Sequence, residues 1–450
     1  MTKVRRVKAI ALGAAGLIAV ALLAASAGSA RTSDAVTLRY ALWDNTQQPG
    51  YQKCADAFHA ANPNITISIE QKGWNDYWPN LTTEFAAGTA PDVFTDHLAY
   101  VSQFAAQKLI VPLDTLPGEA SMPTNIYAGK SAQLWVLPDG HRYAFPKDTD
   151  TGAIVANPKL LKKAGVTLKQ LWSATWNPTN GGTFQQLIAR LSWDTKGRRG
   201  DQKGFDPSHV KTYGFAFDSG TSLVTGQDTW GAWARSMGIK ILNKNPWGNQ
   251  YNYDNPKLAQ IVGWFQKMVR LGYSPAPSAT LSHFQRLEAG QASTIIDGNW
   301  RVTELVGTKG LNPVFAPIPK GPDGHNWSLG NSLGDSIWTG TKHMPEAWQW
   351  VHFLASPACQ NIMGRSGAIV PAIVSADNFV GAAFQRIGAD PSVRAFGTYG
   401  KYKDILPLSD HFDQVSTIMG AAMTKIINDG ASAASTLKTA NSQVNALFGG

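Results

Sequence analysis

The chain has 450 residues and a formal net charge of +9, with 16 tryptophans, 9 histidines and only 2 cysteines. Its basic residues are scattered along the chain rather than gathered into one dense patch, which argues against a nucleic-acid-binding surface. Cysteine and histidine do not occur at the spacings that bind zinc, so the sequence predicts no metal and no cofactor.

Residues 1–30 have the pattern of a secretory signal peptide. Four basic residues within 1–8 precede an uncharged apolar run over 9–25, and small residues that suit cleavage follow it. A retained membrane anchor is the alternative, and it is less favoured because the run is short for a full span. No cysteine stands at the cleavage site, so attachment through a lipidated cysteine is not predicted. Removal of the signal leaves a net charge of +5 and about 420 residues, enough for two domains.

The elements that follow residue 35 predict a parallel sheet. Apolar residues alternate over 36–42 and 65–70, which indicates two strands, and a third strand is expected over 91–94. Helices are predicted between them, over 51–61 and 81–87. This β-α-β-α-β order places the carboxyl ends of the three strands at one edge of the sheet.

The remainder of the chain predicts a second set of strands and helices, with a crossing between two lobes near residues 147–151. Residues 314–319 contain two prolines, which is typical of an edge strand. We expect strands over 153–157, 213–217, 292–296 and 314–319, and helices over 159–164, 229–237, 258–271, 284–290, 346–354 and 414–447.

The tryptophans indicate a ligand with flat apolar faces. Many of them stand beside Gly, Asn, Asp or Pro rather than inside apolar runs. Indole rings stack on the CH face of a sugar, while amides and carboxylates bind its hydroxyl groups. Ligands of open α/β sheets bind at the carboxyl ends of strands. The segment Asp-Gly-Asn-Trp at 297–300 directly follows the predicted strand over 292–296, so it is the first candidate for a binding site.

The two cysteines, Cys54 and Cys359, stand in a chain that is predicted to be exported, where thiols tend to be oxidised. A long-range disulfide is one interpretation, and two separate buried thiols are the other. The sequence leaves both open, because spacing along the chain does not test the geometry that a bridge requires.

Five segments, in this order along the chain, resemble the extracellular solute-binding proteins of bacterial carbohydrate ABC importers, in the maltose-binding-like group. No single segment is diagnostic, but the ordered set spans nearly the whole mature chain. The segments are 58–65, 88–94, 152–165 with its Asn157-Pro158 step, 286–300 with its Asp-Gly-Asn-Trp end, and 347–360.

The resemblance implies an α/β, two-lobe periplasmic-binding-protein-like fold (type II), in which each lobe is a sheet flanked by helices and hinge crossovers join the lobes. We expect an N-terminal lobe of residues 31–147 plus 293–338 and a C-terminal lobe of 148–292 plus 339–450. The family implies a monomeric, non-enzymatic receptor outside the cytoplasmic membrane. It would capture a sugar or oligosaccharide between the lobes and deliver it to permease subunits in the membrane.

The predicted ligand contacts come from strand ends and from the expected crossings. Stacking is predicted for Trp74, Trp230 and Trp300, and hydroxyl acceptance for Asp96, Asp297 and Asp335. His97 is expected beside the site rather than on the ligand. The full set of predicted contacts is Trp43, Asn45, Trp74, Asp76, Tyr77, Asp96, Asp148, Trp230, Asp297, Asn299, Trp300, Asn331 and Asp335.

Two alternatives remain for the function. A secreted glycoside hydrolase also needs export and exposed aromatics, and it requires two carboxylates at a fixed separation. A receptor for a phosphorylated polyol such as glycerol phosphate would use arginines, for which Arg301 and Arg365 are the candidates. The abundant tryptophan favours a neutral sugar.

Overall fold

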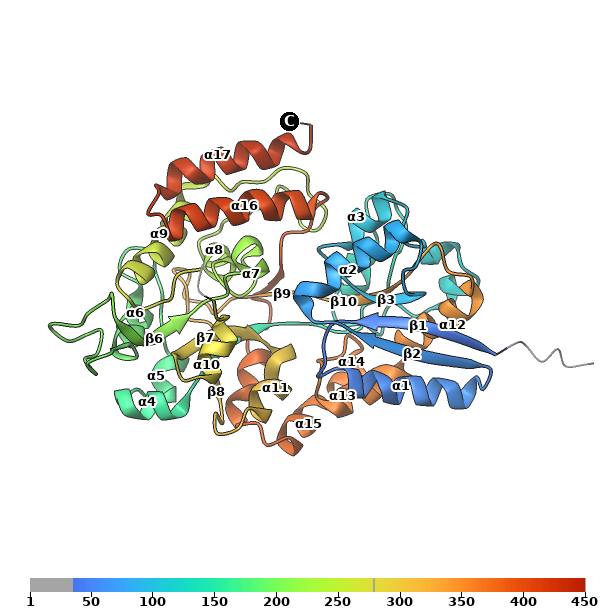
Figure 1. Cartoon of the computed structure of the whole chain (residues 1–450), viewed down its shortest axis with the longest axis horizontal. Helices are drawn as coiled ribbons and strands as arrows, with labels where there is room; N and C mark the ends of the chain where they lie inside the picture. The colour runs from blue at the N-terminus through green and yellow to red at the C-terminus, as the bar shows by residue number, and fades with distance from the viewer. Residues whose placement is uncertain (1–34, 278–279, 450) are drawn as a thin grey trace, which may run out of the picture. The chain divides into compact units, whose positions relative to one another are not determined.

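The computed structural model describes residues 35–277 and 280–449 (Figure 1). The predicted signal peptide, residues 1–30, lies outside the described residues. Within the described ranges, no helix has both the length and the apolar character that crossing a bilayer requires.

The first sheet has four strands in the order β10-β3-β1-β2. β1 (Val36–Leu42) pairs in parallel with β2 (Ile65–Gln71) and β3 (Val93–His97), while β10 (Leu333–Ile337) runs antiparallel to β3. The carboxyl ends of the three parallel strands therefore meet at one edge, as predicted.

Helices cover both faces of this sheet (Figure 1). Leu38, Tyr40 and Leu42 of β1 point into a core that includes residues of α1. Ala41 points to the other side, into a core with Tyr77 of α2. The alternation of β1 thus supplies two apolar faces, and each needs its own helical layer. The helices that pack on these cores are α1 (Gln48–Ala61), α2 (Trp74–Ala87), α3 (Val101–Ala106), α12 (Met344–Leu354), α13 (Pro357–Ser366) and α14 (Val374–Asp377).

The second sheet has five strands in the order β5-β6-β7-β4-β8. β7 pairs in parallel with β6 and antiparallel with β4, which in turn pairs antiparallel with β8. Every residue of β4 and β7 is buried, which explains why both sequences are continuous apolar or small-residue runs. The strands are β4 (Gly152–Ala156), β5 (Trp193–Asp194), β6 (Val210–Ala216), β7 (Ala292–Gly298) and β8 (Val314–Ala316).

Helices also surround the second sheet, and a short pair of strands joins the C-terminal region. β9 (Ser328–Gly330) pairs in parallel with β11 (Lys403–Ile405). The helices are α4 (Pro158–Ala164), α5 (Leu168–Trp172), α6 (Gly182–Arg190), α7 (Thr221–Thr225), α8 (Gly231–Ser236), α9 (Pro256–Arg270), α10 (His283–Glu288), α11 (Val302–Gly307), α15 (Val380–Arg386), α16 (Phe412–Ile427) and α17 (Ala433–Ala446).

The strand pairing corrects the predicted lobe ranges at two places. Residues 293–338 were expected in the N-terminal lobe, but β7 and β8 lie in the second sheet and only β10 belongs to the first. The reason is that β7 is flanked by β4 and β6, so the chain returns to the first sheet only after β9. Conversely, α12 and α13, expected with the second lobe, pack against the core of the first sheet.

Two local predictions also change. Trp74, Asp76 and Tyr77 were expected in the loop after β2, but they form the first turn of α2, which begins directly after Gly73. The predicted contacts Asn331 and Asp335 were expected near a crossing, and the structure places Asn331 just after β9 and Asp335 within β10.

Cys54 and Cys359 form a disulfide in the structure. Their Cα atoms lie 5.2 Å apart, and the bridge joins α1 to α13 across a sequence separation of 305 residues. Both cysteines are fully buried in the core of the first sheet. The bridge therefore links α1, the first helix of the described chain, to α13, which comes much later in the sequence.

Candidate functional site

Two segments that connect the sheets lie side by side and define the centre of the candidate site. The backbone N–H of Lys147 donates to the carbonyl of Leu333 at 2.8 Å, and that of Asp150 donates to Asn331 at 3.1 Å. The end of β7 joins them, because the N–H of Asn299 donates to the carbonyl of Thr151 at 3.0 Å. The ends of β7 and β9 and the starts of β4 and β10 thus meet at one place.

An aromatic cluster stands at the carboxyl edge of the first sheet. The Trp43 ring lies 5.1 Å from Trp74 and 6.4 Å from His97, and Trp74 lies 5.5 Å from His97, measured between centroids. Trp43 and Trp74 are half-buried, so part of each indole remains open. Tyr77 is buried beside them, with its hydroxyl donating to the carbonyl of Thr95 at 2.8 Å. The sequence correctly brought these three aromatics together, but only the tryptophans offer ring surface.

His97 links this cluster to the crossing segment. Its Nδ1 accepts the N–H of Ala99 at 3.1 Å, and its Nε2 lies 2.6 Å from the side-chain amide of Asn331. Burial lowers the pKa of His97 to about 3, so the ring is neutral. The atom of Asn331 that lies at this distance from Nε2 is Nδ2, and its Oδ1 is buried without a hydrogen-bond partner among the described residues.

The end of β7 contributes an orphan acceptor and a third tryptophan. Nδ2 of Asn299 donates to the carbonyl of Thr149 at 3.0 Å, while its buried Oδ1 has no partner in the described part of the chain. Trp300 is half-buried, and its ring lies directly over Gly298. A Cβ atom at residue 298 would collide with the indole, so glycine is required there for the ring to take this position.

The Asp297 carboxylate lies close to two basic side chains, those of His283 and Arg301. Its Oδ2 lies 3.2 Å from Nε2 of His283 and 3.9 Å from Nε of Arg301, and its Oδ1 accepts the N–H of Gly298. Burial raises the pKa of the Asp297 carboxyl, but the hydrogen bond and charge of His283 outweigh burial, so the pKa is lowered. Burial lowers the pKa of His283, but the hydrogen bond and charge of Asp297 outweigh burial, so the pKa of His283 is raised. The hydroxyl-acceptor role predicted for Asp297 stays a prediction.

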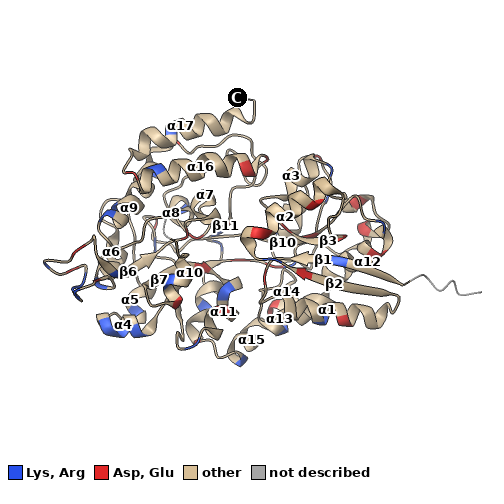
Figure 2. Ribbon diagram, in the orientation of Figure 1, with Lys and Arg blue, Asp and Glu red and all other residues tan. Residues whose placement is uncertain are grey.

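Three further carboxylates lie around the crossing with perturbed ionisation. Asp148 accepts the N–H of Leu333 at 2.6 Å, and burial raises its pKa to about 7. Burial, together with the charges of Asp148, Asp228 and Asp44, raises the pKa of Asp150 well above its usual range. The pKa of Asp228 is likewise raised by burial and by the charge of Asp297. Figure 2 shows acidic segments in the middle of the view, whereas basic residues colour helices such as α4 and α11.

Several predicted contacts have other tasks in the structure. Asp335 forms a buried ion pair with Lys147 at 2.9 Å and accepts the hydroxyl of Tyr40 at 2.8 Å, so it stabilises the first sheet. Asp96 is fully buried and accepts the hydroxyl of Ser336 at 2.9 Å. Trp230 is 0 % exposed, and its Nε1 donates to the carbonyl of Leu223 at 2.7 Å, which leaves no ring face for stacking.

Asn45 and Asp76 are exposed beside the aromatic cluster. Sequence reasoning missed Asp44, Asp150, Asp228 and His283. Asp150 had a usable signal, because it lies two residues beyond Asp148 in the segment expected to cross. Asp228 and His283 had none, since only the packing of the loop between α7 and α8 and of α10 brings them to the end of β7.

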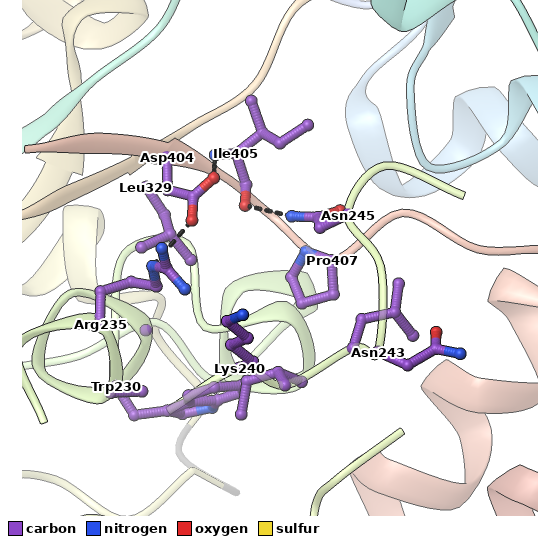
Figure 3. Close-up of a pocket in the computed structure, with 13 residues that line it drawn as sticks. Trp230, Arg235, Lys240, Asn243, Asn245, Leu329, Asp404, Ile405 and Pro407 are labelled. Carbon is purple, nitrogen blue, oxygen red and sulfur yellow. Dashed lines mark hydrogen bonds and ion pairs between the residues drawn. The ribbon is translucent and has the colours of Figure 1, made fainter. Parts of the chain in front are cut away.

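A cavity of about 300 Å³ lies near Trp230, between α8, the residues that follow it and the segment 404–407 (Figure 3). Two of its polar groups are engaged within it: Arg235 forms an ion pair with Asp404 at 2.7 Å, and Asn245 donates to the carbonyl of Ile405 at 3.1 Å. The groups at the crossing, by contrast, include buried acceptors without partners. We therefore place the candidate site at the crossing.

Comparison with known proteins identifies the family of the chain. The family described as bacterial extracellular solute-binding protein matches residues 53–392. The chain belongs to this family. It is 21% identical to the maltotriose-binding protein of Pyrococcus abyssi over 396 residues, which are 86% of this chain and 77% of that protein.

Solved structures of other binding proteins share the fold. An ABC substrate-binding protein from Listeria monocytogenes, in complex with cycloalternan, matches with a TM-score of 0.77 and 15% identity, over 92% of this chain and 100% of that chain. A maltose/maltodextrin-binding domain from Bdellovibrio bacteriovorus, bound to maltotriose, matches with a TM-score of 0.72 and 15% identity, over 92% and 100%. The predicted family and the α/β, two-lobe fold class are therefore confirmed.

Proposed function

We propose that this solute-binding protein captures a sugar or oligosaccharide at the crossing between its two sheets. The observation that carries the proposal is the convergence of aromatic and unpartnered polar groups there. Contacts run without a break from Trp74 through His97 to Asn331, and from there to the crossing segment and Asn299.

The chemistry of these groups suits a saccharide. Trp43 and Trp74 on one side and Trp300 on the other offer half-buried indoles, which can stack on the apolar faces of sugar rings. The buried Oδ1 atoms of Asn299 and Asn331 have no hydrogen-bond partner among the described residues, and such acceptors gain most from a ligand that brings hydroxyl donors. The Listeria and Bdellovibrio neighbours were solved with cycloalternan and maltotriose, which are saccharides.

The proposal includes the transport role that the family implies. The protein would close its two lobes over the sugar by a hinge motion and deliver it to permease subunits of an ABC importer. It would act outside the cytoplasmic membrane as a monomeric receptor without enzymatic activity. In this proposal the chain forms two lobes, and the boundary between them lies at the crossings near residues 146–151 and 330–333.

The phosphorylated-polyol alternative receives no support from its predicted arginines. Nη1 of Arg301 lies 2.5 Å from Glu304, and its guanidinium also faces Asp297. The guanidinium of Arg365 stacks on the ring of Phe379 at 3.7 Å, outside the crossing. Neither arginine is free at the proposed site, so a sugar is the better interpretation.

The test is a saccharide library measured by thermal shift and by tryptophan fluorescence on residues 31–450. We expect at least one saccharide to raise the melting temperature and to change the tryptophan emission, since three indoles line the site. A library in which no saccharide shifts either signal would contradict the proposed function. Trp327→Ala is the control for the change of tryptophan emission, and this variant should keep that change. The Trp327 indole is also half-buried but stands outside the crossing.

A further inference from the structure

We propose that the sugar carries a protonated amine, and that Asp150 and Asp228 bind this ammonium group. The inference rests on the proposed function and deepens it, because it assigns a chemical class to the saccharide. It arises from two carboxylates of different segments that lie on the same face at the start of β4.

The geometry begins at Gly152, the first residue of β4. A Cβ atom at this position would lie 2.8 Å from Oδ1 of Asp228, so the Asp228 carboxylate stands directly over that face of the strand. Asp150 is two residues earlier in the segment that leads into β4. Side chains two residues apart along an extended chain point to the same side. The carboxylates of Asp150 and Asp228 therefore share one face of the crossing.

Neither carboxylate has a cationic partner. In residues 35–277 and 280–449, Asp150 and Asp228 form no ion pair. The nearby cations are already committed: Lys147 to Asp335, and His283 to Asp297. Asp228 is buried and Asp150 is half-buried. A carboxylate withdrawn from water without a counter-charge is unfavourable, and a cation from the ligand would relieve it.

Unsatisfied acceptors give an independent indication. Oδ1 of Asp228 and Oδ1 of Asn299 are buried, and neither has a hydrogen-bond partner within the described ranges. The two residues are 4% exposed each. The Asn299 amide is aimed at the crossing, since its Nδ2 bonds to Thr149, the residue before Asp150. These orphans are all acceptors, so the missing group is a donor. An ammonium group supplies three donors and the missing positive charge together.

The tryptophans fit the same ligand. Trp43, Trp74 and Trp300 present half-buried indoles, and an indole attracts a cation to its face as well as the CH groups of a sugar. A saccharide with an amine would therefore satisfy both the aromatic and the acidic parts of the site. A neutral saccharide would leave the Asp150 and Asp228 charges uncompensated.

The inference makes affinity depend on pH. Burial and neighbouring charges raise the pKa of Asp150 and Asp228, so in the free protein protonation competes with the cation. Affinity should rise as pH increases and these protons are lost, until the amine itself deprotonates at a pH of about 8. The titratable groups that face the pair from the surrounding elements are Asp44, Tyr51, Asp148, Asp218, His283, Asp297 and Tyr399.

The experiment compares glucosamine, N-acetylglucosamine, glucose and the disaccharides built from each, by calorimetric titration from pH 5.5 to 8. We expect the amine forms to bind about 10- to 100-fold more tightly than the acetylated and hydroxyl forms, as charge-assisted hydrogen bonds do. Asp150→Asn and Asp228→Asn should each remove most of this preference and the pH dependence. Asp56→Asn, exposed on α1 and outside the crossing, should change neither the amine preference nor the affinity for the neutral sugars.

The outcomes separate this inference from the proposed function. Equal or tighter binding of the neutral sugars, or an amine preference that survives both Asn variants, would overturn the inference and leave a sugar receptor. Binding of no saccharide at all would overturn both. Folding of the variants is checked by their melting temperatures without ligand, which we expect to rise by about 1–3 °C because a buried like-charge repulsion is removed. If the melting temperatures of both Asn variants fall instead, the titrations are repeated with Asp150→Ser and Asp228→Ser. We expect these variants to lose the amine preference, and a preference that they retain would overturn the inference.

Discussion

Nδ2 of Asn299 donates to the carbonyl of Thr149 at 3.0 Å, and this bond ties the end of β7 to the segment that passes from the first sheet to the second. Asn299 is 4% exposed, and its backbone N–H also bonds to the carbonyl of Thr151. One residue thus holds the crossing segment at two points. The position of Asp150, which lies between those points, depends on it.

Asn299→Ala tests this relationship. The substitution leaves the part-buried carbonyl of Thr149 without its donor, which should lower the free energy of unfolding by about 1–3 kcal/mol. It should also weaken saccharide binding, because the crossing segment loses one anchor. Asn80→Ala is the matched control: its amide also bonds to a backbone carbonyl, that of Asp76, but at an exposed position. Equal losses in the two variants, measured by urea denaturation, would contradict the structural role of Asn299.

Gly298→Ala should impair binding through Trp300. A methyl group at residue 298 collides with the indole of Trp300, so the ring must leave its position. We expect the variant and Trp300→Ala each to weaken binding of the best saccharide by at least about 10-fold, the scale of one lost aromatic contact. The double variant should be no worse than either single variant, because both act on one ring. Additive losses in titration would show that Gly298 acts independently of the indole.

Removal of the disulfide should destabilise the protein without touching the site. Cys54 and Cys359 close a loop with a sequence separation of 305 residues between α1 and α13. A bridge over a loop of this length typically contributes about 2–4 kcal/mol. We expect Cys54→Ala/Cys359→Ala to lower the melting temperature while saccharide affinity at 20 °C is retained. Dithiothreitol should lower the melting temperature of the native protein and leave that of the double variant unchanged.

Lys147→Met should be among the most destabilising single changes in the first sheet. It leaves the Asp335 carboxylate buried without its cation, and breaking a buried pair in this way costs about 3–5 kcal/mol. Lys147→Met/Asp335→Leu should recover most of that loss, because no unpaired charge remains. Chemical denaturation of the three proteins measures the effect. A double variant as unstable as Lys147→Met would mean that packing, rather than charge, explains the loss.

The stability of the ligand-free protein should depend on the protonation of Asp96. Burial raises the pKa of this carboxyl to about 7 in the folded state, well above its unfolded value. Asp96 therefore contributes stability that is fully present below about pH 4 and is lost as pH rises through about 7. Asp96→Asn, which stays neutral, should show a weaker decline of unfolding free energy between pH 5 and 8 than the native protein. Parallel pH profiles would contradict this assignment.

The sequence by itself determined the local elements and the family. Alternation in β1 and β2, the all-buried composition of β4 and β7, and the glycine that ends α10 are properties of short segments, and each was predicted close to its observed place. Trp43, Trp74 and Trp300 were predicted as ligand contacts from sequence, and that role stays a prediction. Each lies within three residues of a strand end, where ligands of open α/β sheets bind.

The tertiary structure alone decided which sheet each later strand joins and which polar groups remain unpaired. β7 joins the second sheet because β4 and β6 offer edges on both sides of it, a choice that no local pattern in 292–298 contains. Asp335 and Asp150 look alike in sequence, yet Lys147 neutralises the first and nothing in the described chain neutralises the second. Burial and partnership arise from contacts between distant residues, so only the folded chain separates a structural carboxylate from one that is left for a ligand.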